Sequence, residues 1–153
     1  MPTIRAWPLA VAMIAAAAAT ATGAQMTEHV AKGNFDVQLT PTSAPDAAVG
    51  AMSIAKTFHG DLDGTSTGQM LAVRTPVDGS AGYVAMERVT GTLAGHKGSF
   101  ALQHSGTLDK GAASLSVSVV PDSSTEGLAG LKGTMDIIVS PGRHDYVFRY
   151  TLP

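Results

Sequence analysis

The stretch ERVTGTLAGHKGSFALQHSG, residues 87–106, decides the fold. Polar and apolar residues alternate along both of its halves, and an Ala-Gly-His-Lys segment at residues 94–97 separates the two halves. Successive side chains of a β-strand point to opposite faces. In the second half, one face therefore carries Phe100, Leu102 and His104, and the other carries Ser99, Ala101, Gln103 and Ser105. The stretch predicts two antiparallel strands joined by a tight turn.

The same alternation continues over the rest of the chain from Ala31 onward, and we predict no helix there. Glycine recurs about every eight to twelve residues, a spacing typical of the short strands of a sandwich or a barrel. We predict an all-β fold, a single closed eight-stranded antiparallel β-barrel. Its expected strands are residues 33–39, 51–59, 65–75, 82–93, 99–107, 112–120, 132–140 and 146–152.

Turn residues allow the pairing of the central strands to be predicted. A two-residue turn at Gly95 and His96 places Glu87 opposite His104. A turn around residues 109–111 places His104 opposite Leu115 in the next hairpin. A three-residue turn there, with a glycine bulge, is the alternative, and it shifts that pairing by one residue while the bulge restores the faces.

These faces place ionisable side chains among apolar ones. Glu87 and His104 become neighbours on a mainly apolar face, and Lys56 shares a face with Met52, Ile54 and Phe58. In a closed barrel we expect Glu87, His104 and Lys56 to form a polar group in the interior, where burial shifts pKa values as acid–base chemistry requires. The alternative is a structural Glu87–His104 pair that only fixes the register of the strands.

The opposite face offers a second set of candidates. Arg88 and Gln103 lie on it, and a one-residue slip in register brings them inside and turns Glu87 and His104 out to solvent. We expect no metal and no cofactor. The chain has no cysteine, its histidines lack metal-ligand spacing, and the loop at residues 59–64 lacks the ligand series of a calcium site.

The first 24 residues have the pattern of a cleaved signal peptide. Arg5 precedes an apolar run at residues 9–19, and small residues follow at 20–24. The run is about half of the ~20 residues that a membrane span needs, so we expect no integral span in the mature chain, residues 25–153. A periplasmic or secreted location follows; if Met26 is the true start, the location is cytoplasmic. A net charge of −2 disfavours a nucleic-acid partner.

Two segments resemble a known family. They are Glu87-Arg88-Val89-Thr90-Gly91-Thr92-Leu93 and Gly98-Ser99-Phe100-Ala101-Leu102-Gln103-His104-Ser105-Gly106. They are similar to the bacterial domain of unknown function 3224 family, and the resemblance covers nearly the whole chain after Met26. It implies a compact, calycin-like eight-stranded barrel similar in shape to allene oxide cyclase. It implies no activity, since the family offers none to transfer, and the first 25 residues depart from the family pattern.

Three functions fit these observations. The first is an exported barrel that binds a small apolar molecule in its interior, oriented by Glu87, His104 or Lys56. The second is an isomerase or cyclase that works by proton transfer through the same residues. The third is a structural barrel with a filled interior, whose outer strands form a homo-oligomer; its apolar candidates are Tyr83, Val84, Met86, Val89, Ile137 and Ile138.

Overall fold

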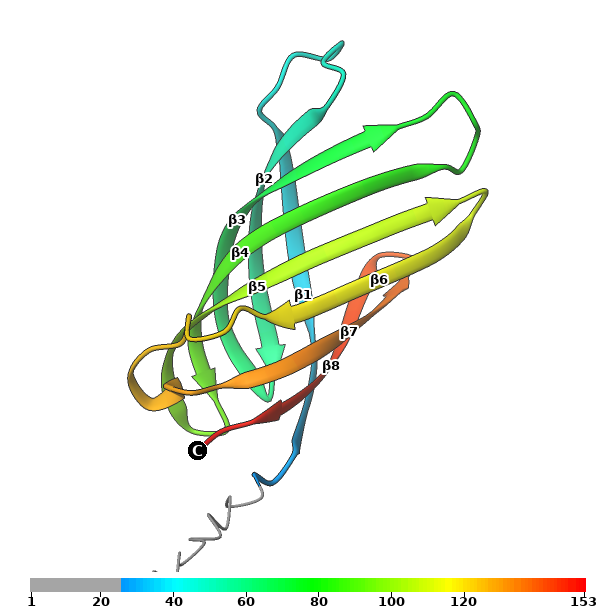
Figure 1. Cartoon of the computed structure of the whole chain (residues 1–153). Helices are drawn as coiled ribbons and strands as arrows, with labels where there is room; N and C mark the ends of the chain where they lie inside the picture. The colour runs from blue at the N-terminus through cyan, green and yellow to red at the C-terminus, as the bar shows by residue number, and fades with distance from the viewer. Residues whose placement is uncertain (1–25) are drawn as a thin grey trace, which may run out of the picture.

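A computed structural model describes residues 26–153 and shows a closed antiparallel barrel of eight strands (Figure 1). Each strand pairs with its neighbours along the chain, and β1 closes the barrel by pairing with β8. The predicted fold is confirmed, while the predicted signal peptide lies outside the described residues. The elements are β1 (His29–Pro41), β2 (Gly50–Gly60), β3 (Leu62–Arg74), β4 (Ala81–Leu93), β5 (His96–Asp109), β6 (Ala112–Val119), the 3₁₀ turn η1 (Glu126–Leu128), β7 (Lys132–Ser140) and β8 (Arg143–Thr151).

The predicted register of the β4–β5 hairpin is wrong by two residues. Ala94 and Gly95, with φ of 49° and 85°, form the two-residue turn, and Leu93 pairs with His96. Positive φ at both central positions is the mark of a type I′ turn, whose twist suits a hairpin. Glu87 therefore lies opposite Leu102 and not opposite His104. A shift of two residues keeps every side chain on its predicted face.

The predicted register of the β5–β6 hairpin is also wrong by two residues, in the opposite direction along the chain. Lys110 and Gly111, with φ of 47° and 93°, form the turn, and Asp109 pairs with Ala112. His104 therefore lies opposite Val117 rather than Leu115. The three-residue alternative is also absent here, and the faces are again those predicted.

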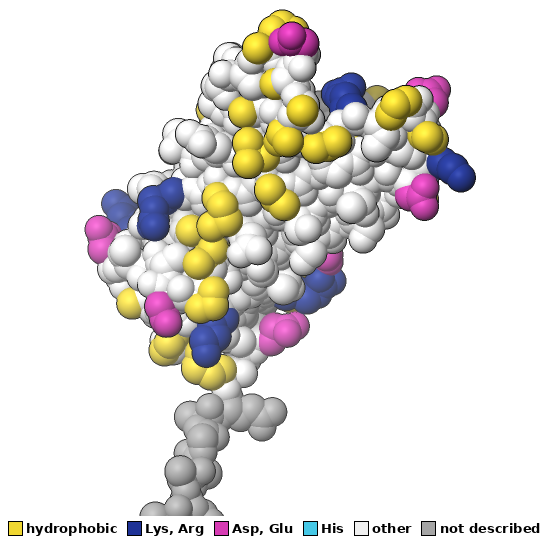
Figure 2. Space-filling view, turned by 45° about the horizontal axis from the view of Figure 1, so that its top comes forward, with side chains coloured by type: hydrophobic (Ala, Val, Ile, Leu, Met, Phe, Trp, Pro, Cys, Tyr) yellow, Lys and Arg dark blue, Asp and Glu magenta, His cyan; other side chains and the backbone are white. Residues whose placement is uncertain are grey.

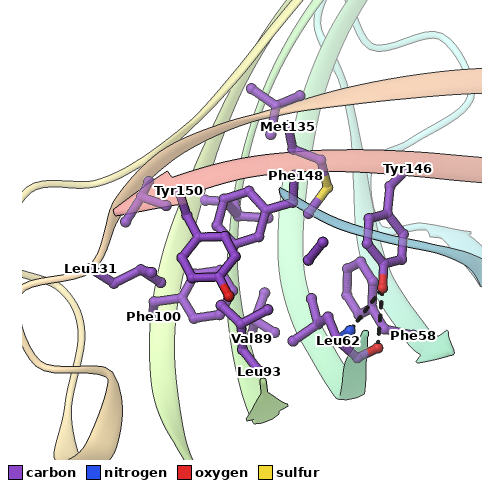
Figure 3. Packing of buried hydrophobic residues seen from close by; sticks show 14 of the residues in the cluster. Phe58, Leu62, Val89, Leu93, Phe100, Leu131, Met135, Tyr146, Phe148 and Tyr150 are labelled. Atoms are coloured by element: carbon purple, nitrogen blue, oxygen red, sulfur yellow. Dashed lines mark hydrogen bonds between the residues drawn. The ribbon is translucent and has the colours of Figure 1, made fainter. Parts of the chain in front are cut away.

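One end of the barrel is filled by side chains, as Figure 3 shows. The Leu62 backbone N–H donates a 2.9 Å hydrogen bond to the Tyr146 hydroxyl, which ties β8 to the start of β3. Burial of each such large apolar side chain contributes about 1.5–3 kcal/mol to folding. This closed end holds the side chains of Phe58, Leu62, Leu93, Phe100, Leu128, Leu131, Tyr146 and Phe148, each at most 1% exposed.

The other end is open. The β1–β2, β3–β4 and β5–β6 hairpins diverge there (Figure 1), and inward-facing side chains are in contact with solvent. Leu39, Leu108 and Leu115 are 46%, 37% and 41% exposed. We call this region the mouth, and define it by the inward-facing residues Leu39, Met52, Met70, Ala72, Tyr83, Leu108 and Leu115.

Candidate functional site

A buried polar cluster lies between the filled end and the mouth, centred on Glu87. Lys56 Nζ donates a 2.7 Å hydrogen bond to Glu87 Oε1, and His104 Nε2 lies 2.8 Å from the same oxygen. The hydroxyl of Ser66 donates to Glu87 Oε2 at 2.5 Å. Lys56, Glu87 and His104 are 8%, 2% and 4% exposed. The structure therefore brings together the three interior residues expected from the sequence, and their function stays a prediction.

Small residues on β3 make this arrangement possible. Lys56 on β2 pairs with Ser66 on β3, and Gly68 on β3 pairs with Glu87 on β4. A Cβ atom on Gly68 would lie 2.7 Å from the Glu87 Cα atom, so only glycine fits there. Because Ser66 and Gly68 are short, the long side chain of Lys56 crosses β3 and reaches the carboxylate on β4.

His104 reaches the same carboxylate from the other side. It lies opposite Ala85, which is two residues before Glu87 on the same face of β4. Diagonal neighbours at this spacing are within reach of long side chains. Side chains on β2, β3 and β5 therefore all form hydrogen bonds with the Glu87 carboxylate.

The cluster keeps Glu87 ionised. Burial by itself would raise the pKa of this carboxyl group, but the hydrogen bond from His104, the charge and hydrogen bond of Lys56, and the hydrogen bond from Ser66 together outweigh it. They lower the pKa of Glu87 from 4.5 to about 2. The Lys56 ammonium is further stabilised by the Phe35 ring, whose centroid is 4.6 Å away.

The hydrogen-bonding state of His104 follows from the ionised Glu87. A carboxylate only accepts hydrogen bonds, so Nε2 of His104 carries the hydrogen. The other ring nitrogen, Nδ1, makes no hydrogen bond to any residue of the described chain, 26–153. Glu87 already accepts hydrogen bonds from three donors, whereas His104 Nδ1 has no partner among residues 26–153.

Tyr83 also faces the interior near Glu87, although the sequence analysis names it only as a candidate for an outer interface. It faces inward on β4, four residues before Glu87, and its ring covers Gly106, where a Cβ atom would lie 2.3 Å from Tyr83 Cε1. Burial and then the charge of Glu87 raise the pKa of Tyr83, so its hydroxyl stays protonated. No residue from 26 to 153 forms a hydrogen bond with that hydroxyl. Alternation along residues 82–93 could have indicated that Tyr83 faces inward. The next residue, Val84, is also apolar, so the pattern does not show which of the two faces the interior.

Arg88 and Gln103 lie on the outside of the barrel. Both are exposed, and Arg88 Nη1 donates to the Ser99 hydroxyl and to the Ser123 carbonyl oxygen, each at 3.3 Å. The one-residue slip that would bring them inside is not observed. Of the apolar candidates for an outer interface, Tyr83, Val89 and Ile137 face inward, whereas Val84, Met86 and Ile138 are about half exposed on the outer surface.

Two of the cavities formed by residues 26–153 measure about 380 and 430 Å³. The first lies under the β1–β2 connection, and the second lies beside β1 and the β7–β8 turn. Neither is lined by Lys56, Glu87 or His104. Among residues 26–153 there is no group of three or more His, Asp or Glu side chains placed to hold a metal ion, and no helix is long and apolar enough to cross a membrane.

Fold and site together define a small eight-stranded barrel with an ionic centre and one open end. The chain belongs to the DUF3224 family of proteins of unknown function, whose model matches residues 31–150. It is similar to a DUF3224-family protein of unknown function from Shewanella oneidensis MR-1, with 44% sequence identity and a TM-score of 0.77. That similarity covers 84% of this chain and 98% of the other. No curated protein matches the chain.

Proposed function

We propose that this barrel binds a small apolar molecule in its mouth, with Tyr83 and His104 orienting the end of the ligand that lies deepest in the barrel. The observation that carries the proposal is the position of the ionic cluster, below a mouth whose inward-facing walls are apolar and partly exposed. Ligand sites commonly combine apolar walls with a few convergent polar groups.

Energetics favour a role beyond folding for the cluster. Replacing a buried ion pair by well-packed apolar side chains is often neutral or stabilising, so stability alone does not require Lys56 and Glu87. Glu87 already accepts three hydrogen bonds from the protein. The Tyr83 hydroxyl and His104 Nδ1 have no partner among residues 26–153, so we assign them to the ligand, and Glu87 and Lys56 act by holding His104 and the local charge in place.

A neutral fluorescent probe, N-phenyl-1-naphthylamine, tests the proposal directly. We expect saturable binding by the wild-type protein. Ala72→Phe, which fills the mouth, is expected to weaken binding at least about tenfold, or about 1.4 kcal/mol. Val73→Phe is the matched control, because Val73 is the next residue of β3 and points outward. Absence of binding, or an equal effect of both variants, would contradict the proposal.

An isomerase or cyclase function is the second candidate, and the geometry of His104 favours it. A carboxylate that orients one imidazole nitrogen while the other stays free is the arrangement that histidine acid–base catalysts use. With a pKa of about 2, Glu87 is a poor proton acceptor, so the proton-transferring group in this function is His104. Deuterium uptake from D₂O into a bound ligand, lost in His104→Gln, tests this function; no uptake by the wild type would count against it.

A structural role in a homo-oligomer is the third candidate. Leu71 and Val84 pair across β3 and β4 on the outer face and are 48% and 53% exposed. Sedimentation at several concentrations tests it. Association that Val84→Lys weakens is expected, and a strict monomer at all concentrations removes this function.

Export is part of the proposal and rests on the sequence of residues 1–24. The test is the mass of the protein recovered from the periplasmic or culture fraction of its cells. Loss of an N-terminal segment ending at Ala21 or Ala24 is expected, and an intact chain that stays in the cytoplasm would contradict export.

A further inference from the structure

We infer that the ligand of the mouth is an anionic amphiphile, whose acidic group binds Arg74 in the cavity under the β1–β2 connection. This inference rests on the proposed function and names the ligand class for the same end of the barrel. The cavity measures about 380 Å³, within the ~300–1,000 Å³ range of small-molecule sites. Two of its lining residues, Met52 and Ala72, also belong to the mouth.

The lining of this cavity is apolar apart from two side chains. Ser43 is one, and its hydroxyl already accepts the Ala51 N–H at 2.9 Å. Arg74 is the other, and no carboxylate lines the cavity. Figure 2 shows hydrophobic side chains gathered between the loops that protrude at the open end.

Arg74 differs from the other arginines of the described chain. Arg143 and Arg149 form ion pairs with Asp145 and Asp136, and Arg88 donates to Ser99. Within residues 26–153, Arg74 makes no ion pair and no side-chain hydrogen bond. It stands at the last position of β3, on the same inward face as Met70 and Ala72.

An apolar cavity with a single free guanidinium selects for one kind of ligand. Guanidinium groups bind carboxylates and phosphates through two parallel hydrogen bonds. The cluster below contributes no competing positive charge, because the Lys56 ammonium is paired with Glu87. A molecule with an apolar body and one acidic group therefore fits this end of the barrel better than its neutral counterpart.

Displacement of N-phenyl-1-naphthylamine by decanoate and by decanol at pH 8 tests the inference. We expect decanoate to displace the probe at a concentration at least about tenfold lower than decanol. Arg74→Gln is expected to remove this preference while the variant still binds the neutral probe. Arg88→Gln, a cation on the outer surface, is the control and is expected to keep the preference. A parallel titration with decyl phosphate shows whether the acidic group is a carboxylate or a phosphate.

The outcomes separate the two claims. Equal displacement by decanoate and decanol, or a preference that survives Arg74→Gln, would overturn the inference while the neutral probe still supports binding in the mouth. If the probe does not bind the wild-type protein, the proposed function fails and the inference fails with it.

Discussion

Lys56 Nζ lies 2.7 Å from Glu87 Oε1, although β3 separates the strands that carry the two residues. The pair forms over Ser66 and Gly68, the two short inward-facing residues between them. Both side chains of the pair are buried, so its removal affects the stability of the fold as well as the site.

Loss of the charge on Glu87 is expected to destabilise the barrel strongly. Glu87→Gln leaves the Lys56 ammonium buried without a counter-charge, and breaking a buried pair in this way costs about 3–5 kcal/mol. Urea unfolding at pH 7 measures the loss. The control is Asp136→Asn, which breaks the exposed pair with Arg149 and should cost at most about 1 kcal/mol.

A double variant separates charge from packing in the same cluster. Glu87→Gln combined with Lys56→Met removes both charges, and we expect it to recover much of the stability that Glu87→Gln loses. A double variant as unstable as Glu87→Gln alone would show that the loss of stability comes from the lost hydrogen bonds to Glu87 and not from the unpaired charge on Lys56.

Stability is expected to fall with acid because of Glu87. Its pKa is lower in the folded barrel, at about 2, than the ordinary 4.5, so its contribution is complete above pH 4.5 and is lost as the pH falls toward 2. The contribution is about 3 kcal/mol. Urea unfolding at pH 7, 4 and 3 measures the decline. The decline should be smaller in Glu87→Gln, and equal pH profiles for the two proteins would argue against the assignment.

Gly68→Ala is expected to disrupt the cluster without changing any charged residue. A Cβ atom at this position would lie 2.2 Å from the Met86 carbonyl oxygen, and such overpacking costs about 1–3 kcal/mol. Gly82→Ala is the matched control, since its nearest contact would be 3.9 Å away. Thermal unfolding measures the Tm of both variants. An equal Tm for Gly68→Ala and Gly82→Ala would contradict the close approach of β3 and β4.

Ala94→Asn is expected to stabilise the β4–β5 hairpin. Ala94 holds a φ of 49°, in a left-handed region that costs an alanine roughly 1–2 kcal/mol and that asparagine adopts more readily. A rise in Tm measures the gain. His96→Asn tests the register originally predicted and should give no gain, because His96 lies in strand β5. A rise in Tm for His96→Asn and none for Ala94→Asn would instead favour a turn at Gly95 and His96.

The sequence predicts the faces of the strands better than their pairing. Alternation placed Glu87, His104 and Lys56 inside, and an error of two residues in the hairpins left that result intact because side chains repeat with a period of two. The pairing itself depended on the turns, and nothing in the sequence marks Ala94 as a residue with positive φ. The sequence therefore predicts the turn at Gly95 and His96, one residue later in the chain than the observed turn at Ala94 and Gly95.

The site residues that the sequence does not predict resemble their sequence neighbours in polarity or lie at the end of a strand. Ser66 lies between Thr65 and Thr67, so no change of polarity marks which of the three faces inward. Tyr83 adjoins Val84, and either residue could fill an apolar interior. Arg74 lies at a strand end, where its relation to the cavity depends on how the β1–β2 connection folds over it.

Native mass spectrometry of the protein purified from its own cells tests binding in the mouth most directly. We expect the wild-type protein and Val73→Phe to carry a small-molecule adduct that Ala72→Phe lacks. A wild-type protein that carries no adduct, and acquires none after incubation with a lipid extract of those cells, would contradict the claim that the mouth is a ligand site.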